Sequence, residues 1–373
     1  MNKREVIIVG GGIAGLTAGI HLADRGVEVL LFEKESFPQH KVCGEYLSRE
    51  VLPYFDELEI PLLEAGPKKI SRLIYSTKKG NFLETSLEPG GLGISRYALD
   101  ELLYRTALER GVEVKQEKVK DIHFGEGHFS VETSSDSYQS KHVLGAFGKR
   151  SNLDKELNRE FFKNPAPWVG IKSHYYLPDF PDDLVGLHNF KGGYCGLSKT
   201  ETGAVNVCFL ATYKSFKDYK NPQVFTEKEL RKNPFLNTFF TEATPLFEQP
   251  LSIAQISFSS KEIVKDHILM VGDSAGLIHP LCGNGMAMAV QGAKIASEVL
   301  LSAFNKAYAG REQMETDYRK KWEKEFRSRL NTGKWLQKIL LKENLAEVSQ
   351  ALLSKMPFLL PEIIKRTHGR AIG

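Results

Sequence analysis

The sequence predicts a mixed α/β (α+β) fold, in which a parallel-sheet domain is interleaved with a mixed β-sheet domain and followed by a helical C-terminus. Three observations predict it. Residues 5–33 read as strand, helix and strand around a glycine-rich turn. Residues 168–211 read as short strands separated by Gly, Pro and Asp. From about residue 284, apolar residues recur at helical spacing.

The first unit begins with an apolar run at 6–9 and turns through Gly10, Gly12 and Gly15. A helical pattern then covers about 13–25. A second apolar run, 27–32, ends on Glu33. This order of strand, glycine turn, helix, strand and acid is the dinucleotide fingerprint of Rossmann-like domains.

Each part of the fingerprint has a physical role. Gly10 allows a tight turn, and Gly12 has no side chain, so the backbone can approach a pyrophosphate. Gly15 and Gly19 let the helix pack close to the strand. The helix N-terminus favours the pyrophosphate anion, and Glu33 can accept hydrogen bonds from the ribose hydroxyls. The contacts predicted in this unit are Gly10, Gly12, Ile13, Ala14, Gly15, Glu33 and Lys34.

A second signal decides which dinucleotide binds. Apolar residues 268–271 predict a buried strand that ends at Gly272 and Asp273, and a helical pattern begins at about Asn284. The carboxylate at the sheet edge can bind the polyol chain of a flavin, and the helix start can stabilise negative charge on the reduced ring. NAD needs no such second element, so the prediction is non-covalent FAD. The contacts predicted here are Gly272, Asp273, Gly283, Gly285 and Met286.

The motifs GGGIAG and GDSAGLIHPLCGNG resemble those of the FAD-dependent aromatic hydroxylase superfamily, which includes para-hydroxybenzoate hydroxylase, the flavin halogenases and the geranylgeranyl reductases. The segment KVCGEYLS, 41–48, resembles the geranylgeranyl reductase branch most, and this resemblance implies that Cys43 and Gly44 lie beside the flavin. It also implies that Arg96, at a predicted helix start, contacts the ribityl or phosphate region. NADH or NADPH is the implied transient reductant.

The sequence departs from the superfamily at two places. Phe147 stands where an Asp of an Asp-Gly pair is expected, which weakens the usual argument for nicotinamide binding. The reductase Tyr-x-Trp-x-Phe-Pro run corresponds to a segment that keeps Tyr194 but has Gly196 and Ser198 in place of the large aromatics. The pocket wall is therefore predicted to be wider or more polar, with a substrate other than a bare isoprenoid.

Three reactions follow from the resemblance, and FAD would carry the redox step in each. The segment 41–48 favours reduction of an activated C=C bond. The alternative is hydroxylation of an aromatic or polyketide substrate. Halogenation ranks third because Trp168 does not begin a Trp-x-Trp-x-Ile-Pro run. The catalytic candidates are Cys43, Tyr194 and His279, each of which also has a purely structural interpretation.

Composition bounds the remaining functions. The 373 residues, 42% hydrophobic and 26% charged, suit a soluble protein with a large core. A net charge of +4, with no recognisable binding module, argues against nucleic acid. The four cysteines form no CxxC pair, which predicts a reduced cytoplasmic protein without structural metal. Use of Cys43 or Cys282 near the flavin remains an alternative to simple burial.

The predicted division has six segments: FAD-binding 1–68, substrate-domain hairpin 69–94, FAD-binding 95–162, substrate sheet 163–258, FAD-binding 259–310 and helical cap 311–373. Within the FAD-binding segments, helices are predicted over 96–110 and 284–304, and the cap opens with a helix over 311–331. The cap holds 14 Lys plus Arg against 8 Asp plus Glu. Its basic face is either simply solvated, or it meets a membrane surface, a lipid-like substrate or a carrier protein. The expected partner is a small-molecule substrate, free or carrier-tethered.

Overall fold

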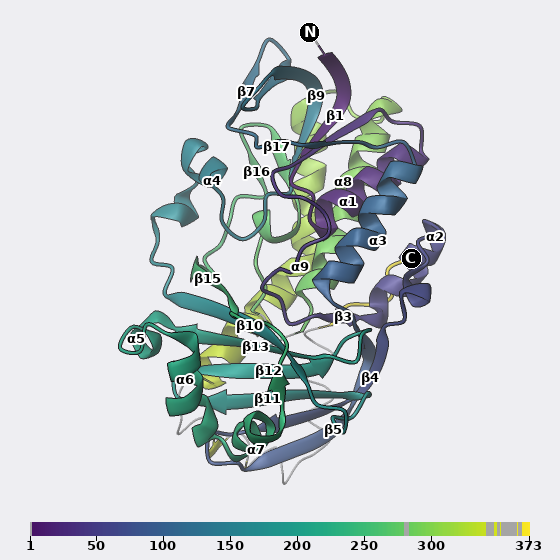
Figure 1. The fold of residues 1–373 in the computed structure, drawn as a ribbon. Helices are drawn as coiled ribbons and strands as arrows, with labels where there is room; N and C mark the ends of the chain where they lie inside the picture. The colour runs from purple at the N-terminus through teal and green to yellow at the C-terminus, as the bar shows by residue number, and fades with distance from the viewer. Residues whose placement is uncertain (1, 280–282, 341–346, 349–350, 352–363, 365–367) are drawn as a thin grey trace.

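Two β-sheets organise the chain in the computed structural model, which describes residues 2–279, 283–340, 347–348, 351, 364 and 368–373. Figure 1 shows one sheet in the upper half of the view and the other in the lower half. The central path of the first sheet runs β16 (Val264–Lys265), β17 (Ile268–Met270), β9 (Ser137–Gly145), β1 (Asn2–Val9), β2 (Val29–Glu33) and β6 (Glu113–Gln116).

The first sheet is parallel at its centre. β1 pairs in parallel with both β2 and β9, and β17 pairs in parallel with β9. Val6, Ile7 and Ile8 are fully buried, which explains why β1 reads as a continuous apolar run rather than an alternating one. β7 (Asp121–Gly125) and β8 (His128–Glu132) extend β9 as an antiparallel meander.

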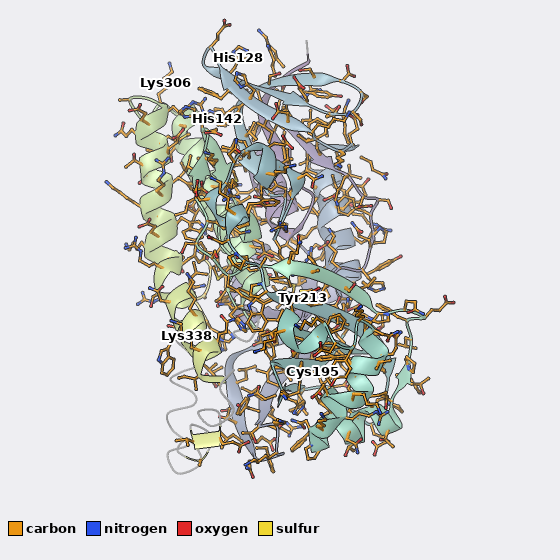
Figure 2. All side chains as sticks on the ribbon, turned by 90° about the vertical axis from the view of Figure 1, so that its left-hand side faces the viewer. His128, His142, Cys195, Tyr213, Lys306 and Lys338 are labelled. Carbon is orange, nitrogen blue, oxygen red and sulfur yellow. The ribbon has the colours of Figure 1, made fainter. Side chains whose placement is uncertain are left out.

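Four helices cover this sheet: α1 (Ile13–Asp24), α3 (Arg96–Glu109), α8 (Gly285–Phe304) and α9 (Arg311–Leu340). α1 packs against both α3 and α8, and α9 packs on α8. Ser95 caps α3 by accepting from the backbone N–H of Ala98 at 3.0 Å. Figure 2 shows α9 along one side of the molecule, with Lys338 near its lower end. α9 is longer than the predicted helix at 311–331.

The second sheet is larger and mixed. Its path runs β14 (Thr244–Pro245), β10 (Trp168–Tyr176), β13 (Val205–Thr212), β12 (Gly193–Lys199), β11 (Leu184–Phe190), β4 (Lys68–Ser76), β5 (Phe82–Gly93) and β3 (Tyr46–Ser48), with β15 (Leu251–Ile256) also paired to β10. The predicted hairpin is the antiparallel pair β4–β5. β4 also pairs in parallel with β11, far away in sequence.

The two faces of the second sheet have different roles. Val169, Val207 and Phe209 point into a core shared with α5 (Tyr213–Phe216), α6 (Pro222–Lys228) and α7 (Pro234–Glu242). The opposite face, with Gly170, Cys208 and Gly196, borders a cavity. Because side chains alternate along a strand, this face is fixed by the apolar residues that fill the other one.

The remaining short elements connect these layers: η1 (Arg49–Val51), α2 (Leu52–Glu57), η2 (Leu62–Ala65), α4 (Asn152–Glu156), η3 (Glu160–Lys163), η4 (Leu230–Lys232) and η5 (Gly272–Ser274). The predicted fold class is confirmed: a Rossmann-like sheet, a mixed sheet and a helical C-terminal part. The six-segment division remains a prediction. Among the described helices, none has the length and apolar character needed to cross a bilayer.

Candidate active site

Close backbone approaches hold the glycine loop between β1 and α1. Gly10 has φ +113°, and a Cβ there would lie 2.3 Å from the carbonyl oxygen of Ala146. A Cβ on Gly15 would lie 2.0 Å from the carbonyl oxygen of Gly10. Gly19 has no such constraint, because its Cβ would make an ordinary 3.6 Å contact with Val112. A methyl group would fit at this position, so the prediction that Gly19 is needed for close packing of the helix on the strand is wrong.

Gly12 has a different role from Gly10. It precedes α1 with φ −84° and ψ −177°, which any residue adopts, so no special backbone freedom is needed there. The nearest atom to an added Cβ would be Nη2 of Arg96, at 3.8 Å. The open space in front of the helix N-terminus thus lies beside a guanidinium. N–H groups and a cation together suit a pyrophosphate.

Glu33 closes the loop from the end of β2. Its Oε2 accepts from the backbone N–H of Gly11 at 2.8 Å, and its Oε1 accepts from that of Lys34 at 2.9 Å. The side chain is almost fully buried, so the carboxylate is rigidly placed at the loop. The side chain of Lys34 points to solvent, where its Nζ lies 3.4 Å from Glu35 Oε1.

The second motif meets the first directly. Gly272 has φ +59°, and a Cβ there would lie 2.9 Å from Cβ of Ala14, so η5 and the start of α1 touch. Asp273 follows in η5, and its carbonyl oxygen accepts from Lys261 Nζ at 2.6 Å. Burial lowers the pKa of Lys261 to about 8. This lysine ties the Asp273 turn to the chain that returns from the second sheet.

One cavity of about 270 Å³ joins both motifs to the second sheet. The predicted residues that line it are Gly12, Ile13, Ala14, Cys43, Gly44, Arg96, Tyr194, Gly272, Asp273, Gly283, Gly285 and Met286. Gly10, Gly15, Glu33, Lys34 and His279 do not line it. The glycine-walled cradle at one end, next to Arg96 and Asp273, fits the diphosphate and polyol of FAD, and the sheet end has room for a ring system.

Arg96 is held in place by a buried carboxylate that the sequence analysis missed. Its Nε and Nη2 donate to Asp100 Oδ1 and Oδ2 at 2.7 and 2.8 Å, and Lys41 Nζ donates to Oδ2 at 2.9 Å. Burial would raise the pKa of Asp100, but the charges of Arg96 and Lys41 outweigh it, and this pKa lies below its ordinary value. The i, i+4 spacing on a helix was the available signal.

The predicted catalytic candidates are only partly brought together. The rings of Tyr194 and His279 lie 5.7 Å apart, and His279 also packs against Phe258 at 4.7 Å. Burial lowers the pKa of His279 to about 3, so its imidazole is neutral at physiological pH. Cys43, in the 41–48 segment, lines the same cavity as Tyr194, whereas His279 does not. Cys282 falls outside the described residues.

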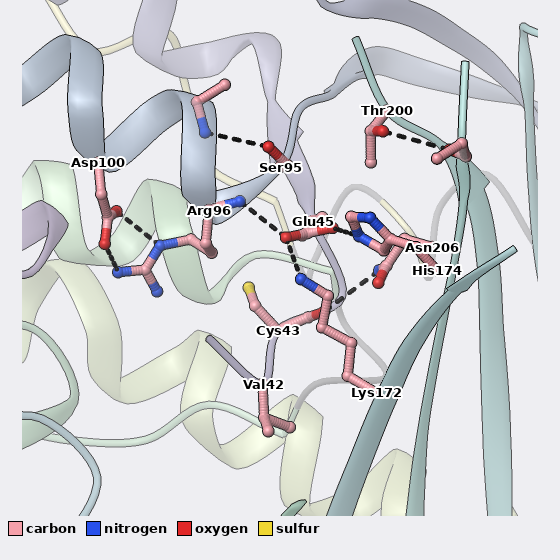
Figure 3. Close-up of polar contacts among 12 residues, drawn as sticks. Val42, Cys43, Glu45, Ser95, Arg96, Asp100, Lys172, His174, Thr200 and Asn206 are labelled. Carbon is pink, nitrogen blue, oxygen red and sulfur yellow. Dashed lines mark hydrogen bonds and ion pairs between the residues drawn. The ribbon is translucent and has the colours of Figure 1, made fainter. Parts of the chain in front are cut away.

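A buried polar cluster at the cavity is the main feature that the sequence analysis missed. Figure 3 shows Glu45 between α3 and the second sheet. Its Oε1 accepts from Lys172 Nζ and, at 2.7 Å, from the backbone N–H of Arg96; its Oε2 lies 2.7 Å from His174 Nε2. Burial would raise the pKa of Glu45, but the hydrogen bond from His174 and the charge of Lys172 keep it below its ordinary value.

The same cluster holds potential metal ligands. His40, Glu45 and His174 offer donor atoms within 4.8 Å of one another, the one such group found in the described part of the chain. However, both oxygens of Glu45 already have partners, and one is the Lys172 ammonium, which repels a cation. The arrangement fits a hydrogen-bonded ion cluster better than a metal site.

Comparisons with known proteins agree on the cofactor family. A family model described as "FAD binding domain" matches residues 3–321. A digeranylgeranylglycerophospholipid reductase of Methanosarcina acetivorans is 24% identical over 337 residues, 85% of this chain and 80% of its own. A 1H-pyrrole-2-carbonyl-[peptidyl-carrier protein] brominase of Pseudoalteromonas luteoviolacea is 24% identical over 322 residues, 81% and 78% of the two chains.

Two further similarities concern length and fold. Conditioned medium factor receptor 1 of Dictyostelium discoideum is 25% identical over 335 residues, and the match covers 81% of this chain but only 64% of that protein. A solved flavin-dependent brominase has a TM-score of 0.79 at 19% identity, covering 97% of this chain and 93% of its own. The latter similarity shows the fold alone. The resemblance to the FAD-dependent aromatic hydroxylase superfamily is confirmed.

Proposed function

Since this chain belongs to the FAD binding domain family and is a flavin-dependent oxidoreductase, we propose that it uses NADH or NADPH to reduce its flavin and then reduces a C=C bond. The substrate is a hydrophobic or conjugated small molecule. The observation that carries this proposal is the position of Cys43 and Gly44, which line the same cavity as Gly12 and Arg96 of the cofactor cradle. They belong to the segment that resembles the geranylgeranyl reductases.

The chain's own residues bind, orient and exclude water. Gly12, Arg96 and Asp273 would hold FAD, which when bound supplies hydride chemistry. The wall of the second sheet is mostly apolar, so a substrate there would be desolvated beside the ring. Its apolar lining residues include Leu73, Leu87, Val185, Leu187, Leu210 and Ile256.

The wall favours a substrate other than a slim polyprenyl chain. Gly196 faces the cavity, and an added Cβ there would have its nearest contact at 3.6 Å, with the Cys208 carbonyl oxygen. Ser198, two residues along the same strand, also lines it. The room left by these small residues supports a polyketide, a conjugated polyene or an aromatic acid.

Oxygen-dependent hydroxylation of an aromatic or polyketide substrate is the second candidate, and halogenation the third. The similarity to the carrier-protein brominase is the reason to retain these two reactions as candidates, and it also supports a substrate tethered to a carrier protein. The same cavity would serve both C=C reduction and hydroxylation, because each of these two reactions needs the organic molecule beside the flavin ring.

The test compares product formation with and without oxygen. The FAD-loaded chain is incubated with NADH or NADPH and a panel of polyenes, polyketides, aromatic acids and geranylgeranyl lipids, under nitrogen and in air, with and without bromide. Product formed under nitrogen supports C=C reduction. Product that appears only in air contradicts it and supports hydroxylation, and product that also needs bromide supports halogenation.

Cell location and macromolecular contacts belong to the same proposal. We infer a cytoplasmic protein that acts on a small molecule without nucleic acid. The basic C-terminal part, with 14 Lys plus Arg from residue 311 onward, is the surface proposed for weak contact with a membrane or a carrier. Membrane contact is tested by sedimenting the protein with anionic vesicles and with neutral vesicles. The proposal predicts that the protein pellets with the anionic vesicles alone.

A further inference from the structure

The cavity face of the second sheet carries a polar corner. On β10 and β13, Lys172 lies opposite Cys208, and His174 lies opposite Asn206. Lys172 and Asn206 are therefore diagonal neighbours on one face, with side chains about 7–8 Å apart at their bases. Cys208 and Glu45 line the cavity. Lys172 and Asn206 do not line it themselves, but they donate to Glu45 and to the Cys43 carbonyl oxygen, which belong to lining residues. The rest of this wall is largely apolar.

Lys172 brings unused donors to this corner. Its side chain is fully buried, and in the described structure its ammonium donates to Glu45 alone. An ammonium has three N–H donors, so two have no hydrogen-bond acceptor, and the ammonium also lies 6.0 Å from the centroid of the Phe247 ring. A buried charge with unsatisfied donors is costly unless a further acceptor is present.

Asn206 brings an unused acceptor. Its Nδ2 donates to the carbonyl oxygen of Cys43 at 3.2 Å, which fixes the orientation of the amide. The residue is only 1% exposed, so bulk water does not reach its Oδ1, and this oxygen has no hydrogen-bond partner in the described part of the chain. An orphaned acceptor of this kind usually marks the place of a water or a ligand group.

We propose that Lys172 and Asn206 bind a hydroxyl group of the substrate, phenolic or enolic, that donates to Asn206 Oδ1 and accepts from Lys172 Nζ. A hydroxyl satisfies both orphaned groups at once because it is donor and acceptor together. Glu45 keeps the ammonium in position, and the apolar remainder of the molecule lies over Val185 and Leu187. The substrate is thus an amphipathic molecule with a hydroxylated head.

This inference rests on one part of the proposed function, namely that the cavity is the substrate site. Its test measures binding and needs no turnover. The oxidised, FAD-loaded chain is titrated with 4-pentylphenol and with 4-pentylanisole, and flavin absorbance reports binding. The methyl ether keeps the ring, the alkyl chain and the acceptor oxygen, but it carries an added methyl group in place of the donor hydrogen. The phenol alone can donate to Asn206 Oδ1, and pairing this otherwise unsatisfied buried acceptor predicts about tenfold tighter binding of the phenol. Equal affinities would overturn the proposal and assign the corner to water.

Two variants locate the effect. Asn206→Leu should remove the preference for the phenol while FAD content and affinity for the anisole stay unchanged. Asn189→Leu is the matched control, because this buried amide on β11 already donates to Tyr75 at 2.8 Å. It should keep the preference. A preference that survives in Asn206→Leu contradicts the assignment.

A second route covers the loss of FAD. If Asn206→Leu does not load FAD, the double variant Glu45→Gln with Lys172→Met replaces it, since it removes both charges together and leaves no unpaired ion. Both ligands accept from Lys172, so both should then bind more weakly while the preference for the phenol remains. Unchanged affinities of both ligands would contradict the proposal. Failure of NAD(P)H-dependent turnover would leave these titrations unaffected, so the two hypotheses fail separately.

Discussion

At the residue scale, Gly12 is the sharpest test of the cofactor cradle. Gly12→Val should abolish FAD binding while leaving a folded chain. The valine fits beside the loop, because the nearest atom to its Cβ is Arg96 Nη2 at 3.8 Å. Its side chain would, however, fill the space that a pyrophosphate needs. The measurement is the FAD-to-protein ratio by absorbance, together with circular dichroism of the apoprotein.

A matched glycine provides the control. Gly19→Ala, inside the helix α1 that follows Gly12, adds a methyl group with only ordinary contacts and should retain FAD. It should also stabilise the chain by up to about 1 kcal/mol, because alanine is the better helix former. A Gly12→Val protein with full FAD content would show that the cradle lies elsewhere.

Gly196 tests the other end of the cavity. Gly196→Trp should block turnover of a bulky substrate without displacing FAD, because its side chain would project into the cavity from β12 of the second sheet, whereas the glycine loop belongs to the first sheet. Steady-state kinetics and FAD content are measured together. Gly196→Ala is the small-step control and should stay active. Improved reduction of geranylgeranyl lipids by the Trp variant would contradict the predicted wall.

The glycines, Arg96 and Asp273 could be predicted because each role depends on a local motif. Lys172 and His174 could not, since they matter only through Glu45, more than 120 positions away, and strand pairing decides which face they share. Phe147 was predicted only to weaken the argument for nicotinamide binding, and it was given no role of its own. It stands where an Asp was expected, and this departure gave no hint of the ion cluster around Glu45.

At the scale of elements, α3 depends on one buried carboxylate. Asp100→Ala should lower the stability of the apoprotein by about 3 kcal/mol, because Arg96 and Lys41 lose their shared partner. The loss should be smaller with FAD, whose pyrophosphate would partner Arg96. Urea unfolding with and without FAD measures both values. An equal loss in the two states would remove Arg96 from the cofactor site.

Elements with strong local signals were predictable, and those defined by distant pairing were not. The βαβ unit and the β4–β5 hairpin follow from apolar periodicity and turn residues. α6 and α7 were missed, although Asn221-Pro222 and Asn233-Pro234 are a cap followed by a proline at the first helical position. The parallel pairing of β11 with β4 joins segments more than 100 residues apart and has no local signal.

At the scale of the whole molecule, the cavity exists because two sheets meet. The glycine cradle belongs to the first sheet and the substrate wall to the second, and Glu45 bonds residues on both sides of the junction. Composition and length could predict a chain large enough for two such layers. They could not predict the ion cluster at the junction, where burial of charge is tolerated because each ion has a partner.

The pH dependence of stability also belongs to the whole molecule. Burial lowers the pKa of His21 and His188 to about 4 and that of His279 to about 3. In the unfolded chain these groups titrate near 6.5. Between about pH 6.5 and 4 the unfolded state therefore binds more protons than the folded state, and stability falls as pH falls. Each histidine contributes up to about 1.4 kcal/mol per pH unit.

Urea unfolding of the FAD-loaded chain at pH 7.5, 6.5 and 5.5 measures this dependence. The free energy of unfolding should change little between pH 7.5 and 6.5 and then drop steeply toward 5.5, before the carboxylates Glu45 and Asp100 begin to contribute at still lower pH. His188→Gln should remove about a fifth of the slope, because burial also lowers the pKa of His40 and His142 to about 4. His123→Gln, at an exposed position of β7, removes no buried imidazole and is the control. A stability that stays constant down to pH 5.5 would mean that these histidines are not buried in the neutral form.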